Sequence, residues 1–211
     1  MCEHKSCPVQ STPVFDPRLT ALLDARIASA DRASIDDEIW RSFGEAWCIM
    51  ATDLSGFSRG VAEQGIIPFL QTIHESARIL IPVVEGHGGL LLKMEGDSFL
   101  AIFRDPNEGV RTAIEMQRAV RRYNDTGRDP VLLGVGLGYG RVLRVAEADV
   151  YGAEVNSACI LGETYANGYD ILITRAVRDA VHGLELEEFP HVPPGAGGAY
   201  RVLYSSTANA R

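Results

Sequence analysis

The pattern of apolar residues near the start of the chain predicts a helical extension. Asp16 and Pro17 are typical of a helix N-terminus, and the apolar residues that follow recur at helical spacing: Leu19, Leu22, Leu23 and Ile27. A second helix start is indicated at Ser34, which is followed three positions later by the acidic residue Asp37. We therefore expect a helical extension over residues 16–43 and, before it, a disordered tail over residues 1–15, which show no periodicity.

Strand-like and helix-like segments alternate after this extension. A short apolar run over 46–52 has the length of a buried strand, and residues 66–85 repeat apolar side chains at helical spacing. Two further strands, 90–93 and 98–103, flank the tight turn 94–97, which is the pattern of a hairpin.

The same alternation continues to the end of the chain. The further predicted elements are a helix 107–123, two strands 132–137 and 142–145 around a turn at 138–140, a helix 155–165, a strand 171–174, a short helix 175–182 and a closing strand 199–204. The order predicts an α+β fold of the ferredoxin-like (split βαβ) type, with an antiparallel-rich sheet and helices on one face. We expect this domain over 44–204 and a tail over 205–211. Many unrelated functions use this fold, so it does not indicate one by itself.

Composition and charge exclude several classes of function. Hydrophobic residues make up 46% and charged residues 23% of the 211 residues, which is typical of a globular domain. The formal net charge of -8 disfavours nucleic acid or an anionic membrane surface as a partner, so we expect neither. No apolar run reaches the ~20 residues that span a bilayer, and the N-terminus lacks the apolar core of a secretory signal. A cytoplasmic location is therefore expected.

The four cysteines do not form a recognisable metal motif. Cys2, His4 and Cys7 stand close together, but their spacing differs from that of a zinc knuckle and no second ligand pair follows. We interpret the two cysteines among them as free thiols in the tail. Cys48 and Cys159 lie in apolar runs and are predicted to pack as small hydrophobic residues.

Two aspartates stand where strands of the predicted sheet end. Asp53 follows the first strand and Asp97 lies in the hairpin turn, so their carboxylates converge if the two strands are neighbours. Such a pair can hold two divalent metal ions that grip phosphates. Gly56 and Phe57 would let backbone N–H groups approach the phosphates, close to the following helix N-terminus. Taken singly, either aspartate is also explained as an ordinary turn residue.

Four ordered blocks of sequence resemble class III adenylate/guanylate cyclases. They are DLSGFS (53–58), GGLLLKMEGDSFLAIF (88–103), VGLGYG (135–140) and DVYGAEVNSA (149–158), and the resemblance covers about residues 45–204. Several blocks in the right order are more specific than any one short motif. The resemblance implies a nucleotide cyclase homology domain that forms a 3′,5′-cyclic nucleotide and pyrophosphate from a nucleoside triphosphate.

The resemblance also implies roles for individual residues. Asp53 and Asp97 match the metal-binding aspartates, which would hold two Mg²⁺ or Mn²⁺ ions per site. Lys93 and Asp149 match the pair that reads the nucleobase, and Asn156 matches the asparagine that orients the ribose. In this family the site forms between two chains of a head-to-tail dimer, so that the metals sit on one chain and the base-reading residues come from the other. A symmetric homodimer would then hold two equivalent sites.

The base-reading pair favours ATP as substrate. Lys93 can only donate hydrogen bonds, and ionised Asp149 can only accept them. Adenine presents a ring-nitrogen acceptor beside an amino donor, and cytosine presents the same edge. Guanine has the opposite polarity and would leave buried groups unpaired at a cost of ~1–3 kcal/mol each, so GTP and UTP are disfavoured while CTP is tolerated. A surface ion pair without a role in recognition is the alternative interpretation of Lys93 and Asp149.

Two positions depart from the family pattern. The family usually has a transition-state arginine four residues after the asparagine, where this chain has Ile160. The family also often has a phosphate-binding lysine before the last strand, whereas segment 193–199 contains no cation. Arg141, Arg144 and Arg201 could in principle substitute, but we interpret them as ordinary surface residues.

These departures leave two hypotheses for the function. One missing transition-state donor typically lowers turnover by ~10²–10³, so we expect binding to survive better than catalysis. The first hypothesis is an active cyclase. The second is a weak or inactive homologue that acts as a nucleotide-binding regulatory module or as one half of a heterodimer. A diguanylate-type cyclase is disfavoured because the Gly-Gly-acidic turn of those enzymes is absent at 94–97.

Overall fold

The structure, a computed structural model, describes residues 16–55, 65–127, 130–145 and 149–205. The predicted tail over 1–15, the predicted phosphate contacts Gly56 and Phe57, and residues 206–211 lie outside the described residues. The chain divides into two compact units, residues 1–43 and 44–211. Within the described parts, no helix has both the length and the apolar character needed to cross a bilayer.

The first unit contains two helices, α1 (Pro17–Ala28) and α2 (Arg32–Phe43). Asp16 caps α1 as predicted, because its carboxylate accepts hydrogen bonds from two backbone N–H groups of the first turn. Helix α2 begins before the predicted start at Ser34. The reason is that Asp31 accepts a hydrogen bond from the backbone N–H of Ser34 at 3.2 Å and therefore serves as the cap.

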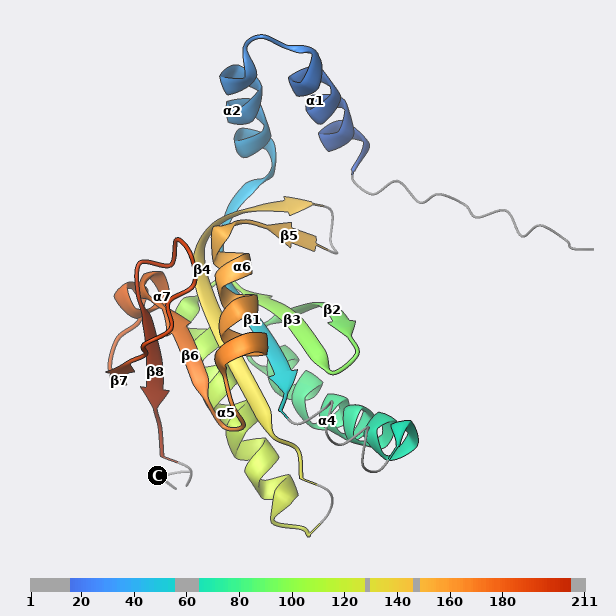
Figure 1. Ribbon diagram of the computed structural model, residues 1–211, viewed down its shortest axis with the longest axis vertical. Coiled ribbons are helices and arrows are strands. Elements are labelled where there is room, and N and C mark those ends of the chain that lie inside the picture. The colour runs from blue at the N-terminus through green and yellow to red at the C-terminus, as the bar shows by residue number, and fades with distance from the viewer. Residues whose placement is uncertain (1–15, 56–64, 128–129, 146–148, 206–211) are drawn as a thin grey trace, which may run out of the picture. The chain divides into compact units, whose positions relative to one another are not determined.

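The second unit is built around one sheet. Its elements in chain order are β1 (Gly44–Leu54), α4 (Ile66–Gly86), β2 (Leu90–Glu95), β3 (Ser98–Phe103), α5 (Pro106–Asn124), β4 (Leu133–Val145), β5 (Asp149–Tyr151), α6 (Ala153–Cys159), the π-helix η1 (Ile160–Tyr165), β6 (Ile171–Thr174), α7 (Arg175–Ala180), β7 (Glu185–Glu188) and β8 (Ala199–Leu203). The strand order is β2-β3-β1-β4-β6-β8-β7, and β5 pairs with β4 (Figure 1). Only the β4–β6 pairing among these described strands is parallel. The predicted α+β class and antiparallel-rich sheet are confirmed, and β7 is an edge strand that the sequence pattern did not predict.

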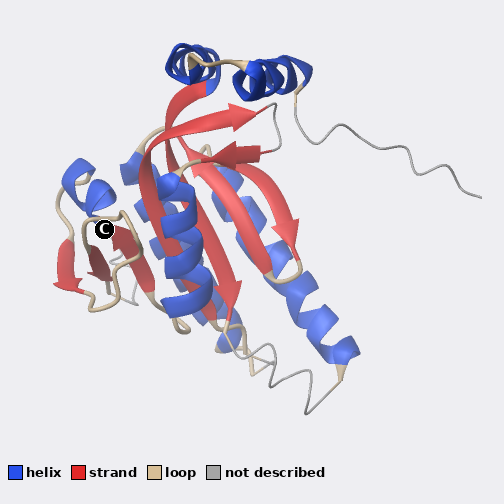
Figure 2. Cartoon of the chain, turned by 45° about the horizontal axis from the view of Figure 1, so that its top comes forward, coloured by secondary structure: helices blue, strands red, loops and turns tan. Residues whose placement is uncertain are grey.

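Helices cover both faces of this sheet, whereas the sequence predicts helices on one face (Figures 1 and 2). Cys48 and Met50 of β1 belong to the core formed with α4 and α5. Trp47, Ile49 and Ala51 point the other way and pack in a second core with α6. Successive side chains of a strand point to opposite faces, so a continuous apolar run such as this one needs cover on both sides. The one-sided prediction is therefore wrong for α6 and η1.

Strand β4 is continuous, whereas the sequence predicts two strands around a turn at 138–140. It pairs with β1 along the whole length of that strand. Its glycines serve close packing instead of a turn: a Cβ on Gly136 would lie 2.2 Å from the carbonyl oxygen of Ala158, and one on Gly138 would lie 2.3 Å from that of Glu154. This absence of side chains brings α6 directly against the sheet.

Candidate active site

The two aspartates predicted to bind metal come together at one end of β1. Asp53 is the next-to-last residue of β1, and Asp97 lies in the turn between β2 and β3, the strand that pairs with β1. Ser98 at the start of β3 donates a hydrogen bond from Oγ to Oδ1 of Asp53 at 3.1 Å. The pairing of β1 with β3 thus sets the positions of both carboxylates.

Both carboxylates are half-buried, and their charges oppose each other. Burial raises the pKa of Asp53, and the negative charge of Asp97 raises it further, against the hydrogen bond from Ser98. Burial also raises the pKa of Asp97, against a hydrogen bond from its own backbone N–H. Ionisation of both carboxyls at neutral pH is therefore unfavourable in the absence of a cation, and a bound cation would stabilise the two charges.

The carboxylates of Asp53 and Asp97 could bind a divalent cation whose other ligands are water or substrate phosphates. Carboxylate oxygens are the ligands that Mg²⁺ and Mn²⁺ prefer. The described residues contain no group of three or more His, Cys, Asp or Glu side chains that could hold a metal ion. A cation at Asp53 and Asp97 would need ligands from elsewhere, and Mg²⁺ in proteins is commonly held by one or two carboxylates together with substrate phosphates.

Replacing Asp53 with asparagine is expected to stabilise the metal-free protein at neutral pH. The raised pKa of Asp53 means that folding stability falls as pH rises and this carboxyl ionises. Asparagine carries no charge, and its Oδ1 can still accept the hydrogen bond from Ser98. Scanning calorimetry at pH 7 without metal should give a Tm higher by on the order of 2 °C. Well below the ordinary Asp pKa of about 3.9, where the carboxyl is protonated in both the folded and the unfolded state, the difference should disappear. A lower Tm of the variant at pH 7 would contradict this account.

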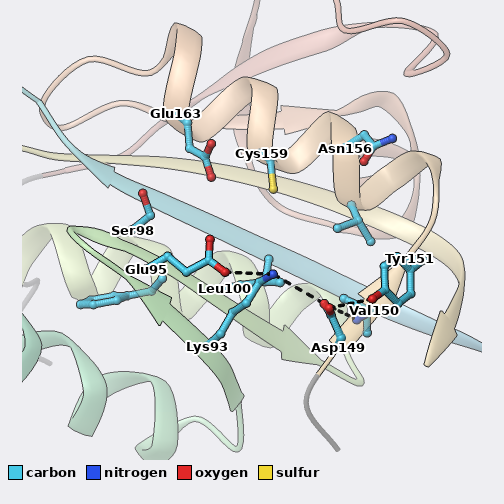
Figure 3. Close-up of a pocket in the computed structure, with 12 residues that line it drawn as sticks. Lys93, Glu95, Ser98, Leu100, Asp149, Val150, Tyr151, Asn156, Cys159 and Glu163 are labelled. Atoms are coloured by element: carbon cyan, nitrogen blue, oxygen red, sulfur yellow. Dashed lines mark hydrogen bonds and ion pairs between the residues drawn. The ribbon is translucent and has the colours of Figure 1, made fainter. Parts of the chain in front are cut away.

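Lys93 and Asp149 meet as a donor and an acceptor on one wall of a cavity (Figure 3). The Nζ atom of Lys93 lies 3.7 Å from Oδ1 of Asp149. Asp149 is oriented by two hydrogen bonds, from the backbone N–H of Val150 to Oδ1 at 3.0 Å and from the hydroxyl of Tyr151 to Oδ2 at 2.9 Å. Burial opposes the charge on Lys93, but Asp149 and Glu95 outweigh it and raise the pKa of Lys93, so this side chain stays cationic.

Asn156 lines the same cavity, from the middle of α6. The cavity has a volume of about 270 Å³ and is bordered by β2, β3, β5, α6 and η1. Its polar lining consists of Lys93, Glu95, Ser98, Asp149, Tyr151, Asn156, Cys159 and Glu163. The structure therefore gathers three predicted site residues in one cavity, Lys93, Asp149 and Asn156. Ser98, which also lines this cavity, donates the hydrogen bond to Asp53, one of the two aspartates predicted to bind metal.

Two residues of this lining were missed from the sequence although a signal for them exists. Glu95 follows Lys93 by two positions on β2, and Tyr151 follows Asp149 by two positions on β5. Residues two apart on a strand share a face, so each lies beside a predicted base-reading residue. Glu95 forms an ion pair with Lys93, with Oε1 and Nζ 3.3 Å apart.

The π-helix η1 and the end of α6 bring an acid and a thiol into the cavity (Figure 3). Burial raises the pKa of Glu163, and the charges of Asp53, Glu95 and Asp97 raise it further, so Glu163 faces the other carboxylates of the site. Burial raises the pKa of Cys159 to about 11, so its thiol is uncharged at neutral pH and is a poor nucleophile. π-Helical turns often occur at functional sites, but no pattern in the sequence indicated this one.

Lys93 is the only cation among the described residues that line the cavity. Ile160 begins η1 one helical turn after Asn156 and presents an apolar side chain where the family pattern has arginine. Arg144 stacks on the ring of Trp47, 5.1 Å from the centroid. Arg201 forms ion pairs with two acidic side chains, each at 3.0 Å. Neither of these two arginines lines the cavity, and both are partly buried, whereas the sequence predicts ordinary surface residues.

An arginine lies beside segment 193–199, although the segment itself has no cation. The backbone N–H of Arg175, the first residue of α7, donates to the carbonyl oxygen of Gly198 at 3.0 Å. The Arg175 side chain lies against Gly197 and Gly198. Arg141, the remaining cation considered from the sequence, is exposed on β4.

Comparison with known proteins gives no match to any family model. The chain is 28% identical over 137 residues to putative adenylate cyclase 3 of Rhizobium meliloti, which covers 64% of the chain and 23% of that protein. It is 27% identical over 147 residues to the adenylate cyclase of Anabaena cylindrica, which covers 61% and 29%. A shorter match, 32% over 78 residues, is to the serine/threonine-protein kinase pkn2 of Myxococcus xanthus and covers 37% of the chain and 9% of the kinase. The chain thus spans less than a third of the length of each of these relatives.

Solved structures of cyclases share the fold of this chain. The adenylate/guanylate cyclase/hydrolase from Silicibacter pomeroyi superposes with a TM-score of 0.64 at 23% identity, over 75% of this chain and 95% of that one. The catalytic core of a rhodopsin-guanylyl cyclase with converted specificity, in complex with ATPαS, superposes with a TM-score of 0.66 at 17% identity, over 75% and 96%. The chain thus has the fold of adenylate and guanylate cyclase catalytic domains, and its sequence relatives include two adenylate cyclases.

Proposed function

We propose that this chain is a nucleotide cyclase that converts a nucleoside triphosphate into a 3′,5′-cyclic nucleotide and pyrophosphate. The observation that carries the proposal is the pair formed by Lys93 and Asp149, which shares a cavity with Asn156. The cyclase relatives support the class of reaction.

ATP is the favoured substrate, and CTP is the next candidate. Lys93 would donate to the ring nitrogen N1 of adenine, and Asp149 would accept from the neighbouring amino group. The hydroxyl of Tyr151 holds Asp149 in one orientation, which lowers the cost of fixing this acceptor when the base binds. Asn156 would hydrogen-bond the ribose and direct its 3′-hydroxyl at the α-phosphate, a contribution of positioning and orientation.

Asp53 and Asp97 would hold Mg²⁺ or Mn²⁺, with two ions per site. When bound, such ions supply charge neutralisation at the phosphates and make the 3′-hydroxyl more acidic. The contribution of the chain is the pair of half-buried carboxylates, whose repulsion favours occupation by a cation. Gly56 and Phe57 stay predicted phosphate contacts.

Exposed apolar residues support assembly with a second copy of the chain. Large apolar side chains between 43% and 77% exposed lie at the start of α4 and on β2: Ile66, Ile67, Leu70, Leu90 and Met94. Large exposed apolar side chains are common where a protein contacts a partner. We propose a head-to-tail homodimer in which the aspartates of one protomer face the base-reading cavity of its partner, with a heterodimer containing another cyclase as the alternative.

Incubation of purified protein with ATP, CTP, GTP and UTP, in Mg²⁺ or Mn²⁺, tests the proposal directly. Cyclic AMP detected by mass spectrometry is the expected main product. The Asp53→Ala variant should lower its formation by about 10³-fold, because the cation loses one of its two carboxylates. Circular dichroism of the variant serves as the folding control. Product formation that is undiminished in a folded Asp53→Ala protein would contradict the assigned site.

A nucleotide-binding regulatory module is the second candidate function. The observation that favours it is Ile160 at the position of the family arginine, together with a described cavity lining in which Lys93 is the only cation. This function requires Mn²⁺-dependent ATP binding by calorimetry and no cyclic product with any triphosphate. Mixing with a cyclase that has the arginine would then restore one site of two in a heterodimer.

A further inference from the structure

Three charged side chains form a row along one wall of the cavity (Figure 3). Lys93 stands in the middle, with Nζ 3.3 Å from Oε1 of Glu95 on one side and 3.7 Å from Oδ1 of Asp149 on the other. Lys93 and Glu95 share a face of β2 because they are two residues apart, and Asp149 reaches the row from β5. The cavity therefore offers acceptor, donor and acceptor in sequence, where the sequence analysis considered one donor and one acceptor.

The two acceptors of this row differ in how firmly they are held. The Asp149 side chain is 33% exposed and accepts hydrogen bonds from Tyr151 and from a backbone N–H. The Glu95 side chain is 74% exposed and forms an ion pair with Lys93. Ion pairs between exposed groups contribute little free energy, so Glu95 can exchange Lys93 for a ligand donor at small cost.

The order of acceptor and donor groups along the row matches the hydrogen-bonding edge of adenine when the ring is placed opposite Asp149 and Lys93. With the amino group at position 6 opposite Asp149 and the ring nitrogen N1 opposite Lys93, both hydrogen bonds form, and the C2–H faces Glu95. Guanine placed in the same position would set its O6 against Asp149 and its N1–H against Lys93. Both pairings are repulsive, which is the reason that two residues alone disfavour GTP.

Moving guanine by one position along the row removes both conflicts. Its O6 then lies opposite Lys93, which donates, and its N1–H and 2-amino group both lie opposite the carboxylate of Glu95, which accepts from both. Asp149 keeps its hydrogen bond from Tyr151 and is not left unpaired. A carboxylate that takes two donors is a strong, charge-assisted acceptor.

We propose that Glu95 is a third base-reading residue, which gives this site a second binding position for guanine beside the adenine position read by Lys93 and Asp149. This inference rests on the proposed function, because it assumes that the cavity is the nucleobase site. It predicts that GTP binds the chain with an affinity close enough to that of ATP to compete with it.

Competition binding with a fluorescent ATP analogue tests this assignment without requiring turnover. N-methylanthraniloyl-ATP in Mn²⁺ is displaced from the purified chain of 211 residues by ATP or by GTP, and the ratio of the two Kd values is the readout. In Glu95→Ala the Kd ratio of GTP to ATP should rise by about 10- to 100-fold, because guanine loses a charged acceptor. In Asp149→Ala the same ratio should fall by about 10-fold, because adenine loses its acceptor. Glu95→Gln, whose amide oxygen accepts only one of the two donors, should give an intermediate ratio.

A partial loss of folding does not change the ratio of the Kd values for GTP and ATP, because it affects the binding of both nucleotides equally. A matched variant tests whether the loss of a negative charge alone changes this ratio. Glu185→Ala removes one exposed glutamate from β7, which does not contribute to the described cavity lining, and it should leave the ratio unchanged. Wild-type protein that binds ATP but not GTP, or a ratio that does not change in Glu95→Ala, would overturn the role of Glu95 and leave the proposed function standing. Failure of the fluorescent ATP analogue to bind at all would overturn the proposed function and this inference with it.

Discussion

Replacing Ile160 with arginine is expected to raise the turnover of ATP by about 10²–10³-fold, because this is the cost of removing one transition-state donor from an active site. Ile160 follows Asn156 by one helical turn, so the new guanidinium starts on the same face of the helix. It would stabilise negative charge that grows on the phosphates in the transition state. Steady-state kinetics in Mn²⁺ should therefore show the gain in kcat, with a much smaller change in KM.

The control for this gain is Ile160→Met, which keeps an uncharged apolar side chain and, like arginine, is unbranched; it should leave kcat close to that of the wild type. The double variant Ile160→Arg with Asp53→Ala should lose the gain, since the arginine acts on a nucleotide that the carboxylates help to hold. A folded Ile160→Arg protein that binds ATP with unchanged kcat would mean that η1 turns this position away from the phosphates. That result would strengthen the regulatory function against the enzymatic one.

Capping residues and prolines near the helix N-termini were sufficient to predict most helix starts in this chain. Helix α5 was predicted from residue 107 and begins at Pro106, where the missing N–H of proline costs no hydrogen bond. Asp105 caps it by accepting from the backbone N–H of Asn107 at 2.8 Å. Such signals lie within a few residues of the boundary that they determine, so one sequence contains them in full.

Contacts between distant segments explain what the sequence did not reveal. The glycines of 138–140 have the composition of a turn, yet they lie in β4 because α6 needs their missing side chains for close approach. In the site, Lys93 and Asp149 were predicted because they belong to ordered sequence blocks. Glu95 lies in the same block as Lys93, and its spacing from Lys93 would have indicated it. Glu163 lies outside the blocks and reaches the cavity only because η1 borders the same space as β2, which depends on how the sheet and helices pack.

Gly136→Ala is expected to be among the most damaging single methyl additions in this domain. The new Cβ would lie 2.2 Å from the carbonyl oxygen of Ala158 and 2.4 Å from the backbone nitrogen of Gly162, and neither backbone atom can turn aside as a side chain could. Relief requires α6 and η1 to move away from β4, at a cost of about 3 kcal/mol or more. For a chain of this size, the Tm by calorimetry should fall by about 10 °C. Because α6 carries Asn156, ATP binding should weaken in the protein that stays folded.

Gly140→Ala is the matched control, since it adds the same methyl group to the same face of β4. Its Cβ would meet Cγ of Glu154 at 3.1 Å, and a flexible side chain can shift by the few tenths of an ångström required. The Tm should therefore change by about 3 °C or less, and ATP binding should persist. Equal losses in Gly136→Ala and Gly140→Ala would mean that strand propensity, rather than the approach of the helix, explains these glycines. A large loss confined to Gly136→Ala would support the account in which the missing side chain at this position lets α6, the helix that contains Asn156, pack directly against the sheet.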